Sequence, residues 1–95
     1  MNEAQKQQLM YRIDEILYYL WDPIGVNDAP GARDEYSSYA GHVWKMAMGG
    51  EAKESISNYL TDITVSRMGL KARKEHDNDI AKLIIRWKEY FDNFG

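Results

Sequence analysis

The 95-residue sequence contains no cysteine, two prolines and two histidines. The absence of cysteine excludes disulfide bonds, thiolate metal ligands and a cysteine nucleophile. No apolar run approaches the roughly 18–20 residues that a membrane-spanning helix needs. Residues 1–8 have neither the basic flank nor the apolar stretch of a secretion signal. We therefore expect a cytoplasmic protein that has no membrane partner.

The overall composition is typical of one folded domain. Hydrophobic residues make up 44% of the chain and charged residues 28%, which is too apolar for intrinsic disorder. A chain of this length has too few residues for two hydrophobic cores, so we expect a single helical domain over residues 1–95. The formal net charge of −3 argues against nucleic acid as a direct partner.

Hydrophobic periodicity predicts an all-α protein, because apolar residues recur at spacings of three and four and no two-residue period is sustained. The helices are expected at about residues 3–21, 34–48, 51–68 and 77–93. Asp34 and Asp77 are suitable N-cap residues, while Gly49–Gly50 and Gly69 suit the ends of the second and third helices. Four such helices with short connections pack most simply as a compact antiparallel four-helix bundle.

A long loop is predicted at residues 22–34, because this stretch has two prolines, two glycines and no hydrophobic period. Pro23 ends the first helix, and the segment from Asp22 to Gly25 fits a type I turn. Loops of this length in small domains are often functional.

No catalytic, cofactor-binding or metal-binding constellation is evident. His42 and His76 lie on different elements and lack a partner at a metal-binding spacing. A hydrolase that uses the loop carboxylates Asp22, Asp34 and Glu35 stays open as an alternative, although the same residues suit turn and helix caps. We therefore predict a protein that is not an enzyme and needs no cofactor.

Charge is unevenly distributed along the chain. Residues 1–62 carry five basic and ten acidic side chains, a net charge of −5, whereas residues 63–95 carry seven and five, a net charge of +2. The acidic part suits a basic surface such as the active site of a nuclease. One basic stretch, comprising Arg67, Lys71, Arg73 and Lys74, is a candidate for nucleic acid, but it also complements the dipole at a helix end.

The outward side of the first helix is the best candidate for a partner surface. With Ile13 at the centre of the buried stripe and 100° per residue, Tyr11 and Tyr18 fall on the solvent side among carboxylates. Tyrosine is enriched in interfaces, and carboxylates speed encounter with a basic partner. The predicted partner-binding residues are Tyr11, Asp14, Glu15, Tyr18, Asp22, Asp28, Asp34 and Glu35.

Two alternatives for these aromatic side chains remain open. Tyr18 or Tyr19 could widen the contact of the first helix with a second neighbour inside the bundle. A homodimer is equally possible, and its candidate residues are Tyr18, Tyr19, Trp44 and Met48.

The sequence W-D-P-I-G at residues 21–25, followed by D-E-Y at residues 34–36 and by Tyr39, resembles a family of small bacterial helical proteins. Some members are similar to immunity proteins encoded beside contact-dependent growth-inhibition toxins. The resemblance extends over most of the chain, through Tyr59-Leu60 and Met68-Gly69 to the final helix with its Ile80-Ala81-x-Leu83 pattern.

This resemblance implies an immunity protein that binds a cognate toxin C-terminal domain, expected to be a nuclease, and blocks its active site or substrate access. The alternative is a helical interaction module without a toxin. The signature also has a structural explanation, in which Trp21 packs under the loop, Asp22 accepts hydrogen bonds from turn amides and Tyr36 enters the core. The signature therefore identifies the fold better than it identifies a binding site.

Overall fold

The computed structural model describes residues 1–21 and 32–94, without the side chains of residues 32–34 and 94. The described elements are α1 (Glu3–Glu15), η1 (Ile16–Trp21), α2 (Ala32–Met48), α3 (Lys53–Asp62), η2 (Ile63–Arg67) and α4 (Lys74–Phe94). Because η1 and η2 are π-helical continuations of α1 and α3, four helical rods result, and the predicted all-α four-helix bundle is confirmed.

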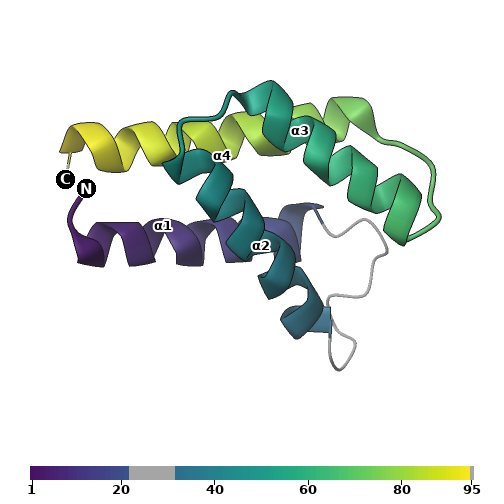
Figure 1. Ribbon diagram of the computed structural model, residues 1–95, viewed down its shortest axis with the longest axis horizontal. Coiled ribbons are helices and arrows are strands. Elements are labelled where there is room, and N and C mark those ends of the chain that lie inside the picture. The colour runs from purple at the N-terminus through teal and green to yellow at the C-terminus, as the bar shows by residue number, and fades with distance from the viewer. Residues whose placement is uncertain (22–31, 95) are drawn as a thin grey trace.

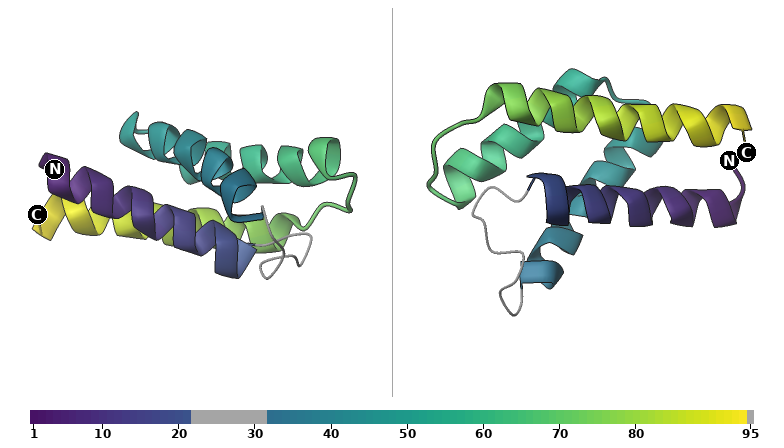
Figure 2. Two further views of the ribbon diagram at one scale, coloured as in Figure 1. Left: turned by 90° about the horizontal axis from the view of Figure 1, so that it is seen from below. Right: turned by 180° about the vertical axis from the view of Figure 1, so that it is seen from behind.

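The four rods pack in two layers (Figures 1 and 2). In one layer α1 and α4 lie side by side and antiparallel, which brings the two ends of the chain together. In the other layer α2 packs mainly against α1, and α3 packs mainly against α4. The apolar core lies between the layers, and it includes the predicted Tyr36, which is fully buried. One side of the α1/α4 layer therefore faces away from the other two helices.

Several helix ends follow the sequence rules for helix capping. At the start of α1, the Asn2 side chain accepts a hydrogen bond from the Gln5 backbone N–H, and the Gln5 side chain accepts one from the Asn2 N–H. This reciprocal arrangement satisfies two donors that a helix start leaves without partners. Gly50 and Gly69 have φ angles of 79° and 66°, so the predicted left-handed endings of α2 and η2 are confirmed.

Three predicted helix starts are wrong by two or three residues. The third helix begins at Lys53, two residues after the predicted start, and α2 begins at Ala32, so Asp34 lies in its first turn. The fourth helix begins at Lys74, because the Asp77 N–H already donates to the Arg73 carbonyl at 2.9 Å. Asp77 is therefore not a cap, and its side chain is free to point into the core. The rest of the predicted loop, residues 22–31, lies outside the described residues.

The π-helical turn η1 changes which side chains face outward. Its hydrogen bonds close over five residues, so each residue turns through less than the 100° of an α-helix. Leu20, which the α-helical period places in the buried stripe, is instead 53% exposed. On the fourth helix, the α-helical period places Tyr90 on the apolar side with Ile80 and Trp87, but Tyr90 is 51% exposed. Both side chains therefore reach the outside of the α1/α4 layer.

Candidate partner-binding face

The outer side of the α1/α4 layer carries most of the exposed large apolar side chains. Six such side chains occur among the described residues. Tyr11, Tyr19, Leu20 and Tyr90 lie on this side, whereas Val65 and Leu70 lie on or after η2. We name the surface the α1–α4 face, and it comprises Tyr11, Arg12, Glu15, Tyr19, Leu20, Leu83, Arg86, Trp87 and Tyr90. Apolar concentrations of this kind mark binding surfaces.

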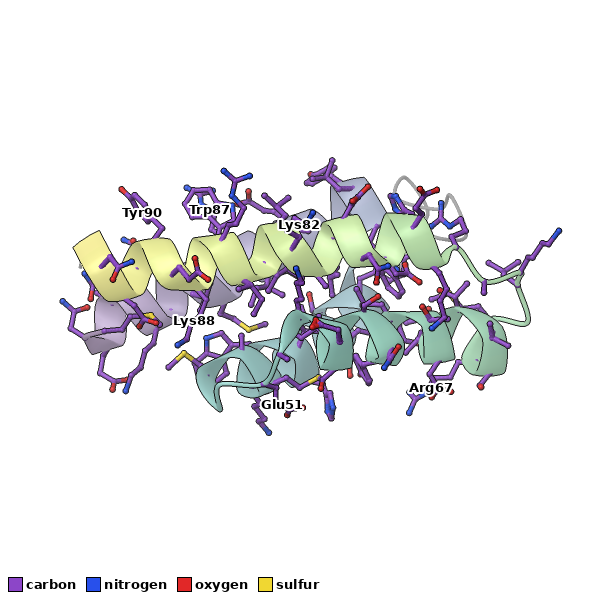
Figure 3. All side chains as sticks on the ribbon, turned by 90° about the horizontal axis from the view of Figure 1, so that it is seen from above. Glu51, Arg67, Lys82, Trp87, Lys88 and Tyr90 are labelled. Carbon is purple, nitrogen blue, oxygen red and sulfur yellow. The ribbon has the colours of Figure 1, made fainter. Side chains whose placement is uncertain are left out.

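Three shallow hollows run across the α1–α4 face. The first lies on α1 and has a volume of about 180 Å³, the second lies between α1, η1 and α4 at about 260 Å³, and the third lies on α4 at about 460 Å³. The first and second share Arg12 and Glu15, and the second and third share Leu83 and Trp87. The hollows therefore form one continuous strip. In Figure 3, Trp87 and Tyr90 project from α4 on the side away from α2 and α3.

Arg12 links the two helices that build this face. Its guanidinium lies 5.3 Å from the centroid of the Trp87 ring, and its Nη1 lies 3.2 Å from Oε2 of Glu15. The Trp87 ring also makes an edge-to-face contact with Tyr90 at 5.6 Å. A cation–π contact and an ion pair together hold Arg12 in place. Tyrosine, tryptophan and arginine are the residue types that dominate binding energy in protein interfaces.

The structure brings together two of the predicted partner-binding residues and separates others. Tyr11, which is 57% exposed, and Glu15 lie on the α1–α4 face. Asp14 and Tyr18 were expected on the solvent side, but both are half-buried because α2 crosses α1 there. The Ser37 hydroxyl donates to Oδ1 of Asp14 at 2.8 Å. The predicted outward orientation of Asp14 and Tyr18 is therefore wrong.

The remaining predicted residues fall near the start of α2 or outside the described residues. Glu35 is exposed, and its Oε1 accepts a hydrogen bond from the Tyr39 hydroxyl at 3.0 Å. Asp22 and Asp28 lie outside the described residues, as does the side chain of Asp34.

A buried polar network joins three helical rods, and sequence reasoning missed it. Asp77 is fully buried, and its two carboxylate oxygens accept hydrogen bonds from Trp21 Nε1 at 2.9 Å and from the Thr61 hydroxyl at 2.8 Å. The Arg73 guanidinium donates to the Trp21 carbonyl at 2.8 Å. One sequence signal pointed to this network, because Asp77 lies on the apolar stripe of Ile80. The network fixes the end of η1 against α3 and α4.

Within the described residues, the aromatic side chains of the sequence signature contact one another inside the fold. The Trp21 and Tyr36 rings lie 5.7 Å apart, and the Tyr39 ring lies within 6.4 Å of both. Burial raises the pKa of Tyr39, and its hydrogen bond to Glu35 raises that pKa further. The Tyr39 hydroxyl donates to Oε1 of Glu35. These contacts support the role of the signature in the fold.

The basic residues near the end of the third helix mostly contact the protein itself. The Arg67 guanidinium lies 5.8 Å from the Tyr39 ring centroid, and Lys74 Nζ donates to Asn58 at 3.4 Å. Arg73 donates to the Trp21 carbonyl, so three of the four residues of the basic stretch contact other parts of the fold.

His42 lies on α2, outside this stretch, and its ring stacks on the Tyr59 ring with the centroids 4.3 Å apart.

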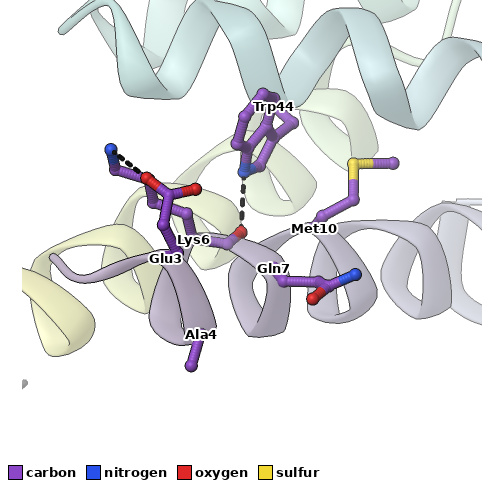
Figure 4. Close-up of a pocket in the computed structure, with 6 residues that line it drawn as sticks. All are labelled: Glu3, Ala4, Lys6, Gln7, Met10 and Trp44. Carbon is purple, nitrogen blue, oxygen red and sulfur yellow. Dashed lines mark hydrogen bonds and ion pairs between the residues drawn. The ribbon is translucent and has the colours of Figure 1, made fainter.

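A separate hollow lies between α1 and α2 (Figure 4). Its volume is about 610 Å³, and its lining includes Met10 and the half-buried Trp44. Trp44 Nε1 donates to the Lys6 carbonyl at 2.9 Å, and Lys6 Nζ lies 3.2 Å from Oε1 of Glu3. Because these polar groups already have intramolecular partners, this hollow offers a ligand less than the α1–α4 face does.

A candidate metal cluster and a membrane-spanning helix are both absent from residues 1–21 and 32–94. No three histidine, aspartate or glutamate side chains gather there as a metal site would require. None of the helices described there has the length and apolar character needed to cross a membrane. Comparison with protein-family models, curated proteins and solved structures found no match for the chain. The α1–α4 face and the sequence signature are therefore the two features of the chain that bear on its function.

Proposed function

We propose that this protein is an immunity protein that binds a cognate contact-dependent growth-inhibition toxin domain through the α1–α4 face. Binding would block the toxin's active site or the approach of its substrate. The observation that carries the proposal is the gathering of Tyr11, Tyr19, Leu20 and Tyr90 on one face. The resemblance of the W-D-P-I-G and D-E-Y signature to immunity-like proteins supports the choice of partner.

A protein partner suits this face better than a small molecule does. Ligand pockets bury most of a small molecule's surface in a deep cleft, whereas the three hollows are shallow and lie along two helices. The two helices under the face are packed against each other, and Arg12 of α1 also contacts the Trp87 ring of α4. A preorganised surface binds with a smaller loss of entropy.

The second candidate is an interaction module without a toxin. On this interpretation a second copy of the chain, or an unrelated protein, covers the same exposed apolar side chains. The half-buried Tyr18, Trp44 and Met48 already pack against the core, so Tyr19 is the one member of the predicted homodimer set that is exposed. An isolated gene favours this candidate, and a neighbouring toxin gene favours immunity.

Co-expression with the toxin domain encoded beside the gene tests the proposal. Cells that produce the toxin domain alone should stop growing, and co-expression of this protein should restore growth. The two proteins should also purify together at micromolar concentration. A toxin domain of an unrelated system is the control, and it should be neither bound nor neutralised. Absence of both a complex and protection would contradict the proposal.

A further inference from the structure

The largest hollow of the α1–α4 face lies entirely on α4. It is lined by Leu83, Arg86, Trp87 and Tyr90 and has a volume of about 460 Å³. Three of its four lining residues are apolar or aromatic, and Arg86 is the one that carries a formal charge at neutral pH. The Trp87 ring forms the boundary with the neighbouring hollow, where Arg12 lies over it. The hollow thus has an apolar wall and a cationic group.

Arg86 has no partner among the described residues, unlike Arg12 and Lys88, and it is the cation that lines this hollow. Arg12 pairs with Glu15, and Lys88 pairs with Asp92 at 2.6 Å. Arg86 is exposed and forms neither an ion pair nor a hydrogen bond with a described residue, including Glu89 one turn further along α4. A guanidinium presents several donors in a planar fork that fits a carboxylate in two-point fashion.

We propose that this hollow is the anchor site for a partner segment in which a carboxylate lies next to a bulky apolar side chain. The apolar side chain contacts Leu83, Trp87 and Tyr90, while the carboxylate pairs with Arg86. This inference deepens the proposed function and rests on it for the identity of the partner, which is the toxin domain. Arginine and aromatic side chains, the types that line this hollow, carry much of the binding energy once a partner covers them and excludes water.

A fragment pair tests the anchor site without the toxin. The probes are 3-phenylpropionate, which joins a ring to a carboxylate, and its amide, 3-phenylpropanamide. In an NMR titration of the full chain, the acid should give saturable shifts confined to residues 83–90, with a dissociation constant that is roughly millimolar for so small a ligand. The amide should bind about tenfold more weakly, because it lacks the charge-assisted bond to Arg86.

Two matched variants identify the cation that recognises the acid. Arg86→Gln should abolish the preference for the acid over the amide. Lys82→Gln should preserve it, because Lys82 is on the same helix but lines a separate hollow with Lys53, Glu54 and Asn78. Equal binding of acid and amide to the unaltered protein, or the absence of saturable shifts, would overturn the anchor site.

The toxin complex separates failure of the anchor from failure of the proposed function. Arg86→Glu should weaken toxin binding by at least about tenfold, and Lys82→Glu should leave it unchanged. Tight binding of the toxin by both variants would overturn the anchor and leave the immunity function standing. Selective fragment binding without any toxin complex would support the anchor and contradict the immunity function.

Discussion

Replacing Asp77 by alanine should lower the free energy of unfolding by about 2–3 kcal/mol. The side chain is fully buried and accepts hydrogen bonds from Trp21 and Thr61. Alanine would leave the buried Trp21 N–H without an acceptor, and that loss costs more than the bond itself contributes. In a domain of this size the melting temperature should fall by roughly 10–20 °C. Chemical and thermal denaturation followed by circular dichroism provides the measurement.

Conservative variants separate the hydrogen bonds from packing. Asp77→Asn keeps a carbonyl oxygen for Trp21 and should cost about 1 kcal/mol. Combining Asp77→Ala with Trp21→Phe, which removes the indole N–H, should be less costly than the sum of the two single changes. A destabilisation by Asp77→Ala below about 0.5 kcal/mol, which is typical of surface positions, would contradict the structural role of this network.

The double variant Tyr19→Ala with Leu20→Ala should weaken binding of the neighbouring toxin domain by about 100-fold. Both side chains are more than half exposed on the α1–α4 face, so their removal should alter the fold little. Truncating a hot-spot residue such as Tyr19 costs about 2 kcal/mol, and leucine, which is seldom a hot spot, adds less, so the sum of about 2.7 kcal/mol corresponds to a 100-fold loss. Calorimetric titration of the toxin domain would measure the effect directly.

The matched control removes the two exposed apolar side chains outside the face. Val65 and Leu70 are 47% and 37% exposed and belong to η2 and the segment after it. The double variant Val65→Ala with Leu70→Ala should bind the toxin domain as the unaltered protein does. An equal loss of affinity in both double variants would show that general apolarity, and not this face, determines binding.

The four helices were predictable because the core follows a 3.6-residue period. That period depends on local spacing, so it survives without knowledge of the tertiary fold. Capping rules were less reliable. Asp77 resembles an N-cap residue, but its side chain is buried and accepts hydrogen bonds from Trp21 and Thr61. A tertiary hydrogen bond outweighed a local preference. The apolar stripe of Ile80 indicates that Asp77 faces inward, but its partners Trp21 and Thr61 are visible only once the helices are packed together.

Part of the α1–α4 face could be predicted from the sequence, and the rest depends on how the helices pack. Tyr11 and Glu15 lie opposite the buried stripe of α1, and a single helix is enough to place them. Tyr90 lies near the apolar stripe of α4, and only the two-layer packing shows that it reaches solvent. The exposure of Leu20 depends on the π-helical turn, for which the sequence carries no evident signal. The orientation of Asp14 depends on the crossing of α2.

Amide hydrogen exchange of the complex with the neighbouring toxin domain tests the central claim most directly. If the toxin docks on the α1–α4 face, exchange should slow in residues 11–20 and 83–90 and stay unchanged across α3, which lies in the other layer. Protection confined to α2 and α3, with residues 11–20 and 83–90 exchanging as in the free protein, would contradict the assignment of the binding surface.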